Sequence, residues 1–483
     1  MTAAADRSSD AVAVYPQRWL AAAVMIAAVT MDLIDLTIVN VALPTIRADL
    51  KASPSQLEWV ISAYMLSFAA LLIIAGSFGD LLGRKRIFLA GIAVFGAASL
   101  AAGLAQRPDE LIAARVVQGA AAAAMTPQLL ATFRAIFTHE ERGKAFGIYG
   151  ATLGFASAVG LIAGGVLTDA DLFGWGWRTV FLVNLPIALA TFVLAVRAVP
   201  ETRDPQAGRP DLIGALLLSA SLVAIAYPLV EGRSNGWPAW GWLLLAAGVA
   251  GLVGLGLIEQ RRTHTRVAPL LRPSLLRIPA FSAGLAVMAA FAAGLQGFFL
   301  ILAVWLQTGI GFSPLAAGLT ALAFSIGSFA LAALAVPLAR RYGRVVLFGG
   351  GVLMALGALA VRIGASHVDG PTDFWPIVPG LAIAGIGLSL QIIPLANVVL
   401  AAVPREVAGG AGGTLSTMQQ IGGALGIAIV GTVFFDRVAA GGGFTSAFRH
   451  AIPIAIALFI ATALLSLALP STALSEAELA EVE

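Results

Sequence analysis

Cysteine is absent from this chain of 483 residues, and histidine and charged side chains are scarce, with four histidines and 11% Asp, Glu, Lys and Arg. Without cysteine, no disulfide framework or thiolate metal site can form. The four histidines fall in or beside predicted loops, so we expect no metal centre: His139, His264, His367 and His450. No G-x-x-x-x-G-K-[ST] phosphate loop occurs, which argues against ATP as an energy source, and no H-E-x-x-H zinc motif occurs.

Hydrophobic residues make up 59% of the chain, and the mean hydropathy is +0.92. A soluble core cannot absorb that much apolar surface. A membrane-spanning helix needs about 20 mostly apolar residues, and such stretches recur between short charged or Pro- and Gly-rich breaks. The 53 glycines suit close helix packing in a bilayer better than disorder. The fold class is therefore an all-α polytopic membrane protein, whose environment is the lipid bilayer.

The hydropathy pattern predicts about fourteen spans. They are placed at 19–42, 57–77, 87–105, 110–131, 145–168, 179–197, 212–230, 240–258, 280–305, 314–338, 345–364, 375–400, 410–434 and 450–469. With a cytoplasmic N-terminus, the basic clusters at 84–86, 261–262 and 340–344 all fall on the cytoplasmic side. This agrees with the positive-inside rule, which places Lys and Arg in cytoplasmic loops, so we expect both termini in the cytoplasm.

Two pairs of segments indicate an internal repeat. The stretch 127–147 resembles 394–412, since each runs from a mid-helix Pro to a cytoplasmic Glu and then into a Gly-rich span, and Gly83-Arg84 is echoed by Gly343-Arg344. Two six-helix halves with an inserted helical pair satisfy both matches. The predicted units are a cytoplasmic segment 1–18, a bundle 19–197, a linker 198–278 holding the pair 212–230 and 240–258, a bundle 279–470 and an acidic cytoplasmic tail 471–483.

The loop after the second span reads G-x-x-G-D-x-x-G-R-K-R. An ordinary positive-inside turn is one interpretation, since glycines suit a sharp reversal and the basic residues hold the loop in the cytoplasm. The order of residues nevertheless resembles the signature loop of the major facilitator superfamily, which implies a role as a gating loop near the thirteenth span and Arg405. The residues concerned are Gly76, Gly79, Asp80, Gly83, Arg84 and Arg86.

The resemblance continues along the chain and is closest to the fourteen-helix drug:proton antiporter branch of that superfamily. The matching landmarks are Leu33–Pro44 in the first span, Arg115–Gly119 in the fourth, Gly174–Pro186 at the entry to the sixth, and the later segments 305–318 and 420–426. The fold implied is two six-helix bundles plus the inserted central pair. The location implied is the bacterial inner membrane.

The fifth span departs from the family pattern. The family has G-x-x-x-G-P-x-x-G-G, a motif associated with antiport, whereas this chain has Ala156, Gly160, Leu161, Gly164 and Gly165 at the corresponding places. The Pro bend is therefore in doubt, although the remaining glycines still permit a close helix contact. Generic glycine-mediated packing is the alternative explanation.

Asp32 and Asp35 in the first span are the most informative residues of the sequence. A charge at the bilayer centre costs roughly 2.5–3.5 kcal/mol on insertion scales, so both must face a cavity or a partner. At about 1.5 Å per residue, Arg115 lies at the depth of Asp35, with Asp32 nearer to Gln118. We expect these three charged residues to form a proton-coupling site, with Asp32 as the titrating group; a permanent structural ion pair between Asp35 and Arg115 is the alternative.

Further polar and aromatic residues within the spans are candidates for a substrate cavity between the two halves. Interhelical hydrogen bonding is the competing explanation for each of them. The candidates are Asn40, Gln118, Gln296, Phe298, Phe299, Trp305, Gln391 and Gln420.

The sequence and the resemblance together predict a secondary transporter that exports amphipathic drugs or toxic small molecules by alternating access, in exchange for protons. It would use the proton gradient and no cofactor, and we expect neither a nucleic-acid partner nor an obligate protein partner. A dedicated exporter or importer of one endogenous metabolite is the alternative. An intramembrane enzyme is disfavoured, because neither a zinc-protease motif nor a cysteine nucleophile is present.

Overall fold

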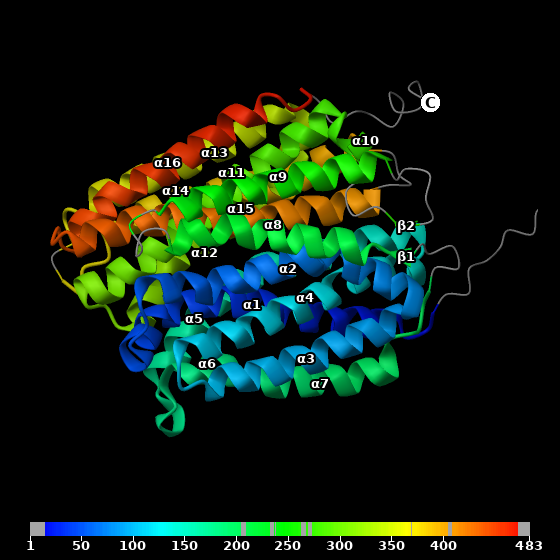
Figure 1. Ribbon diagram of the computed structural model, residues 1–483, viewed down its shortest axis with the longest axis horizontal. Coiled ribbons are helices and arrows are strands. Elements are labelled where there is room, and N and C mark those ends of the chain that lie inside the picture. The colour runs from blue at the N-terminus through cyan, green and yellow to red at the C-terminus, as the bar shows by residue number, and fades with distance from the viewer. Residues whose placement is uncertain are drawn as a thin grey trace, which may run out of the picture.

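Nearly every described residue lies in a long helix, and the helices run roughly side by side (Figure 1). The computed structural model describes residues 15–203, 209–231, 236, 238–261, 267–268, 273–368, 370–403 and 408–471. Helices are the expected form for such apolar segments, because a helix satisfies its own backbone hydrogen bonds where water is absent.

The first part of the chain forms the N-terminal bundle, named here for α1 to α7. Its helices are α1 Arg18–Leu50, α2 Pro54–Leu82, α3 Arg84–Leu104, α4 Pro108–Ile136, α5 His139–Asp169, α6 Thr179–Leu182 and α7 Asn184–Ala198. Two 3-10 turns, η1 Leu172–Gly174 and η2 Gly176–Arg178, connect α5 to α6. Within this bundle α2 packs against α4, α4 against α3, and α1 against α5.

The last part forms the C-terminal bundle, α11 to α16. Its helices are α11 Pro279–Val304, α12 Pro314–Tyr342, α13 Arg344–Gly364, α14 Val378–Ala401, α15 Ala408–Ala439 and α16 Phe444–Ser466. A π-helical turn, η3 Trp305–Ile310, extends α11. The packing pattern matches that of the first bundle, since α14 packs against α12 and α13, and α11 against α15 and α16.

Between the bundles the chain forms the inserted pair α8 Leu212–Glu231 and α9 Ala239–Arg261, followed by the short helix α10 Pro273–Leu276. The pair is flanked by two strands of two residues each, β1 Arg209–Pro210 and β2 Val267–Ala268. These pair in parallel, with Arg209 opposite Val267 and Pro210 opposite Ala268. The strands therefore join the entry and the exit of the inserted pair.

Helices occupy all fourteen predicted span positions, once Gly176–Ala198 is taken as one passage. Within the described residues, twelve helices are long and apolar enough to cross a membrane. The two long helices outside that set are α4 and α5, and their crossing stays a prediction. The residues 1–14, 404–407 and 472–483, which include Arg405 and most of the acidic tail, lie outside the described residues.

Most helices exceed their predicted bounds at one or both ends, because helices continue past the apolar stretch into polar caps. Ser53 caps the start of α2 with a reciprocal capping box. The Gln56 backbone N–H donates to the Ser53 side chain, and the Ser53 backbone N–H donates to the Gln56 side chain. The predicted first span ends at residue 42, but α1 continues through Pro44 to Leu50. A membrane helix tolerates an internal proline when its neighbours satisfy the freed backbone group.

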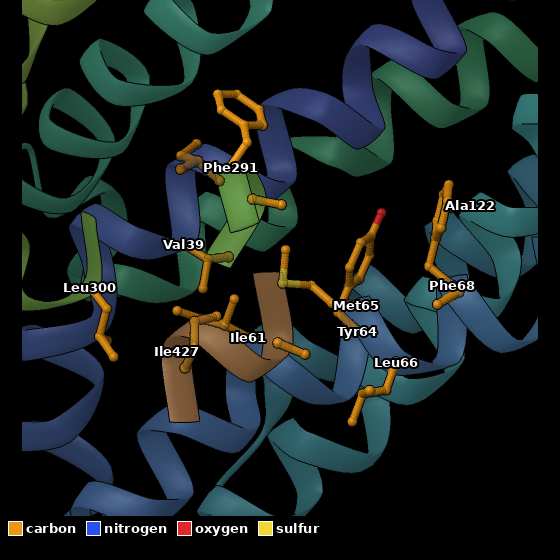
Figure 2. Close-up of a cluster of buried hydrophobic side chains, with 14 of the residues drawn as sticks. Val39, Ile61, Tyr64, Met65, Leu66, Phe68, Ala122, Phe291, Leu300 and Ile427 are labelled. Carbon is orange, nitrogen blue, oxygen red and sulfur yellow. The ribbon is translucent and has the colours of Figure 1, made fainter. Parts of the chain in front are cut away.

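The two bundles meet along two seams. In one seam α5 packs against α12, and in the other α2 packs against α15. Side chains of both bundles share one apolar cluster, in which Val39 and Met65 from the first bundle lie beside Leu300 and Ile427 from the second (Figure 2). We call the end that holds Arg18 and the turn at Gly83 between α2 and α3 the predicted cytoplasmic end, and the opposite end the predicted external end.

Candidate functional site

Asp35 lies at the centre of a buried ionic cluster inside the N-terminal bundle. Its carboxylate accepts hydrogen bonds from three side chains on two other helices. Arg115 Nη1 donates to Oδ2 and forms an ion pair with it, Asn184 Nδ2 donates to Oδ1 at 2.9 Å, and Gln118 Nε2 donates to Oδ1 at 3.4 Å. Neither Asp35 nor Arg115 is exposed to any measurable degree. The carboxylate is therefore held by three donors, as a buried charge requires.

Arg115 is held from α2 as well as from α1. Its Nε donates to the Val60 carbonyl at 3.0 Å, and its guanidinium carbon lies 4.3 Å from the centre of the Tyr64 ring. Nη1 also donates to Gln118 Oε1 at 3.1 Å. An arginine over an aromatic face gains a cation–π interaction, so the guanidinium is attached to α1, α2 and its own helix together.

Ser99 on α3 connects the two amides that donate to Asp35. Ser99 Oγ on α3 accepts from Gln118 Nε2 at 2.8 Å and from Asn184 Nδ2 at 3.4 Å. Both amides thereby keep their carbonyl oxygens and nitrogens in fixed orientations. The same two amides donate to the Asp35 carboxylate, and charge-assisted hydrogen bonds of that kind are stronger than neutral ones.

Asp32, one turn earlier on α1, has different surroundings. Its side chain is buried, and its Oδ1 accepts a hydrogen bond from the Tyr64 hydroxyl of α2. Gln118, expected at the depth of Asp32, binds Asp35 instead, because it lies one turn from Arg115 on the same face of α4. The two carboxylates, three residues apart on α1, thus have separate hydrogen-bond partners.

Close packing of α2 on α4 brings Tyr64 to Arg115, and Gly119 permits it. A Cβ at position 119 would collide with the backbone carbonyl of Tyr64 and the side chain of Ser67. Only glycine allows this approach of one helix backbone to another. The fourth-span motif therefore supplies both the arginine and the space in which it meets its partners.

The segment predicted to be a gating loop is almost entirely helical, since α2 continues to Leu82 and α3 begins at Arg84, which leaves only Gly83 between them. It is held mainly by its own bundle. Asp80 Oδ1 accepts from Arg84 Nη2 at 2.8 Å, and Gly83 adopts a φ of +113°, which favours glycine. Gly79 faces Gln128, and Gly76 faces Pro127, both of α4. Arg86 Nε lies 3.7 Å from Glu201 Oε2 in the segment after α7. The predicted partner Arg405 lies outside the described residues.

The three glycines of the fifth-span motif have two different neighbours. Gly160 packs against Thr37 and Gly164 against Ile38 and Val41, all on α1, whereas Gly165 faces the backbone of Pro314 and Leu315 at the start of α12. The helix α5 runs unbroken from His139 to Asp169 through position 161. The motif therefore joins α1 within the bundle and the opposite bundle at the predicted external end.

Several cavity candidates lie at the seam between the bundles. Asn40 and Phe299 line a small cavity of about 20 Å³, together with Gln307, whose Nε2 donates to the Val41 carbonyl at 2.7 Å. Gln296 of α11 reaches Met65 of α2, with 4.0 Å between Nε2 and Sδ. The space is water-sized, so the bundles lie nearly in contact at this level.

Other candidates are buried within the C-terminal bundle. Trp305 donates from Nε1 to Thr445 Oγ1 at 3.1 Å and stacks on Phe448 with 4.4 Å between the ring centres, so it packs inside the bundle rather than lining the seam. Phe298 is buried beside Phe299, and Gln420 is buried on α15. Gln391 is fully buried, and among the described residues neither atom of its amide has a hydrogen-bond partner.

The charged members of the cluster were predicted from the sequence. Three uncharged members were not predicted: Tyr64, Ser99 and Asn184. Asn184 carried a signal, since it lies in the sixth-span landmark. A tyrosine in the middle of an apolar span was a weaker signal for Tyr64. Ser99 carried none, because a serine that bonds within a helix bundle has no distinctive spacing.

Comparisons with known proteins find similar sequences among membrane transporters and resistance proteins. A family model described as Major Facilitator Superfamily matches residues 25–426. The chain is 43% identical to a probable actinorhodin transporter of Streptomyces coelicolor over 87% of this chain and 73% of that protein. It is 37% identical to a puromycin resistance protein of Streptomyces alboniger, over 88% and 83% of the two chains. It is 32% identical to the multidrug resistance protein Stp of Mycobacterium tuberculosis, over 83% and 73%.

Solved structures show the same fold at low identity. A D-xylose-proton symporter superposes with a TM-score of 0.63 at 14% identity, covering 94% of this chain and 98% of that one. An auto-inhibited POT family peptide transporter superposes with a TM-score of 0.64 at 15% identity, covering 93% and 96%. These likenesses establish the fold.

Proposed function

Because the chain belongs to the major facilitator superfamily, and is a multi-pass membrane transporter rather than an enzyme, we propose that it exports small amphipathic molecules in exchange for protons. The relatives named for actinorhodin, puromycin and multidrug resistance support export rather than uptake. Their bacterial origin supports a place in the inner membrane, with both termini in the cytoplasm.

The observation that carries the proposal is the buried pair of carboxylates on α1 with different partners. Asp35 accepts from three donors, including a full positive charge, whereas Asp32 accepts from one phenol. Opposite charge and hydrogen-bond donors favour the ionised form of a carboxyl group, and their scarcity favours proton uptake. Asp32 is therefore the group that binds and releases the transported proton, and Asp35 with Arg115 forms the fixed part of the site.

Alternating access supplies the coupling. The bundles touch at the predicted external end, where Gly165 meets Leu315 and Gln307 meets Val41. Release of these contacts would open the seam outward and admit external protons to α1. One proton moving down about 100 mV supplies about 2.3 kcal/mol, enough for an approximately forty-fold gradient of a neutral substrate.

A proteoliposome assay tests the proposal. With the fluorescent cation ethidium as the probe and an imposed pH gradient, wild-type protein should drive dye transport, and Asp32→Asn should abolish the dependence on the gradient. Asp169→Asn, an exposed carboxylate at the end of α5, is the matched control and should leave transport unchanged. Gradient-driven transport that survives Asp32→Asn would overturn the assignment.

A dedicated exporter of one endogenous metabolite is the second candidate, favoured by the 43% identity to a probable actinorhodin transporter. The two functions differ in the range of substrates. Deleting the gene should raise intracellular accumulation of several unrelated cationic dyes if the range is broad, and should leave dye accumulation unchanged if the transporter serves a single product.

A further inference from the structure

We propose that Tyr64 is a positioning residue that couples the protonation state of Asp32 to the Asp35–Arg115 ion pair. This inference rests on the proton-coupled function proposed above. Tyr64 is fully buried in the middle of α2, and it contacts both charged groups through different parts of its side chain. Its hydroxyl donates to Asp32 Oδ1, and its ring face lies 4.3 Å from the guanidinium carbon of Arg115.

The chemistry of a phenol suits this position. A tyrosine hydroxyl can donate a hydrogen bond and can also accept one. When Asp32 is ionised, the hydroxyl donates to the carboxylate. When Asp32 is protonated, the carboxylic acid can donate to the phenol oxygen. Tyr64 can thus remain attached to Asp32 in both states, while the direction of the hydrogen bond reports which state is present.

The ring transmits that difference to the guanidinium. Arg115 is held against α2 by Tyr64 and by the Val60 carbonyl one turn away, and against α1 by Asp35. A displacement of α2 relative to α1 must therefore strain the Tyr64–Asp32 contact, the Arg115–Asp35 contact, or both. The three helices α1, α2 and α4 consequently respond together to the charge on Asp32.

The next residue of α2 points to the other bundle. Met65 lies against Gln296 of α11 and against Gly423 of α15, where a Cβ would approach its side chain. Figure 2 shows Met65 among side chains of the apolar cluster shared by both bundles, with Tyr64 next to it on the same helix. One turn of α2 therefore has one side chain on the ionic cluster and the adjacent one on the seam that must open.

Four titratable or charged groups in the described structure interact with Asp32, through a hydrogen bond or through electrostatics. They are Asp35 on its own helix, Tyr64 on α2, Arg115 on α4 and Tyr149 on α5. Tyr64 is the member of this group that donates a hydrogen bond to Asp32 and also contacts the guanidinium. Removing its hydroxyl alone should change Asp32 without removing the ring from Arg115.

The test is an infrared pH titration of the purified full-length protein, which follows the C=O stretch of protonated carboxylic acids. The band assigned to Asp32 is identified by its loss in Asp32→Asn. In Tyr64→Phe its midpoint should move toward higher pH by about one unit or more, because the ionised carboxylate loses a charge-assisted hydrogen bond, which is stronger than the neutral one that the protonated form loses. Tyr227→Phe, on α8 beside Trp59 and Trp240, is the matched control and should not move it.

A purely structural role for Tyr64 would lower the unfolding temperature of Tyr64→Phe but leave the midpoint in place, and that result would overturn the inference. If Tyr64→Phe is poorly folded, wild-type protein is used, and the phenol C–O stretch is followed through the same titration. A hydrogen bond between Tyr64 and Asp32 that reverses direction predicts a shift of this band at the Asp32 midpoint, and a band that stays unchanged there would contradict the inference. Because the titration needs no substrate, its outcome is separate from failure of wild-type protein to transport ethidium.

Discussion

The two bundles share a packing pattern but bury different chemistry. The N-terminal bundle encloses charged side chains, among them Asp32, Asp35 and Arg115, in an extended hydrogen-bond network. In the described part of the C-terminal bundle, the buried polar side chains are all uncharged, as with Gln391 and Ser389. The same helical scaffold thus carries an ionic cluster on one side of the seam and an apolar, aromatic interior around Trp305 on the other.

The described residues therefore confine buried charge of this kind to one bundle. Burying a charge has a desolvation cost and is tolerated only when the charge is paired and hydrogen-bonded. That cost applies to the N-terminal bundle, whereas the described part of the C-terminal bundle buries uncharged polar side chains. The C-terminal bundle supplies, through α15 and α12, the surface against which α2 and α5 pack.

The largest effect should follow from Arg115→Ala, which leaves the Asp35 carboxylate buried without its counter-charge. Removing one partner of a buried ion pair costs about 3–5 kcal/mol. The unfolding temperature in detergent should fall steeply, and gradient-driven ethidium transport should be lost. Arg107→Ala, which removes an exposed ion pair with Glu110, should leave both unchanged.

A double variant sharpens this prediction. Arg115→Ala combined with Asp35→Asn removes both charges, so the unfolding temperature should recover in part while transport stays absent. No recovery would mean that the loss in the single variant arises from packing rather than from an unpaired charge.

The same substitution should have opposite effects in the two bundles. Gln391→Leu removes an amide without described partners and should raise the free energy of unfolding by about 1 kcal/mol, because burying an unpaired polar group is unfavourable. Gln118→Leu removes an amide bonded to Arg115, Asp35 and Ser99 and should lower it. Thermal unfolding of the two variants side by side is the measurement.

Ethidium transport by Gln391→Leu is measured in the same preparation. A large rise in the Michaelis constant, without a loss of stability, would place Gln391 in the substrate site and contradict a purely apolar role for this bundle.

The smallest effect concerns the predicted cytoplasmic end, where Arg18 joins α1 to Glu141 at the start of α5, with 2.8 Å between Nη2 and Oε1. The hydrogen bond from Arg18 lowers the pKa of the Glu141 carboxyl below its ordinary value, although burial opposes the shift. A lowered pKa in the folded state contributes stability above the ordinary pKa of glutamate, and that contribution is lost as the pH falls through the folded-state value.

Glu141→Gln should therefore cause a small fall in unfolding temperature at pH 7, and this difference from wild type should vanish in strongly acidic buffer. Screening by salt should also reduce it, since both side chains are partly exposed. A difference that grows as the pH falls would contradict this sign.

Much of the fold could be predicted from the sequence, because span length and loop charge are local properties. The sequence indicated fourteen helical passages and placed Arg115 at the depth of Asp35 from helix rise, and the ion pair between them agrees with that depth. It did not predict that Gln118 would bind Asp35 rather than lie at the depth of Asp32. Gln118 binds Asp35 because Arg115 and Gln118 lie one turn apart on the same face of α4. Nor did the sequence indicate that Trp305 packs on Phe448, because an aromatic near a span end has the same pattern whichever helix it meets.

Local chemistry determined that this chain is a helical membrane protein of a transporter family, since apolar length and ordered motifs do not depend on which helices touch. Tertiary structure decided which groups share the buried charge. Tyr64 reaches the cluster from α2 through the close approach that Gly119 permits, and Asn184 reaches it from α7, far from Asp35 in sequence. Contacts of this kind depend on the distance between helices, which no single span encodes.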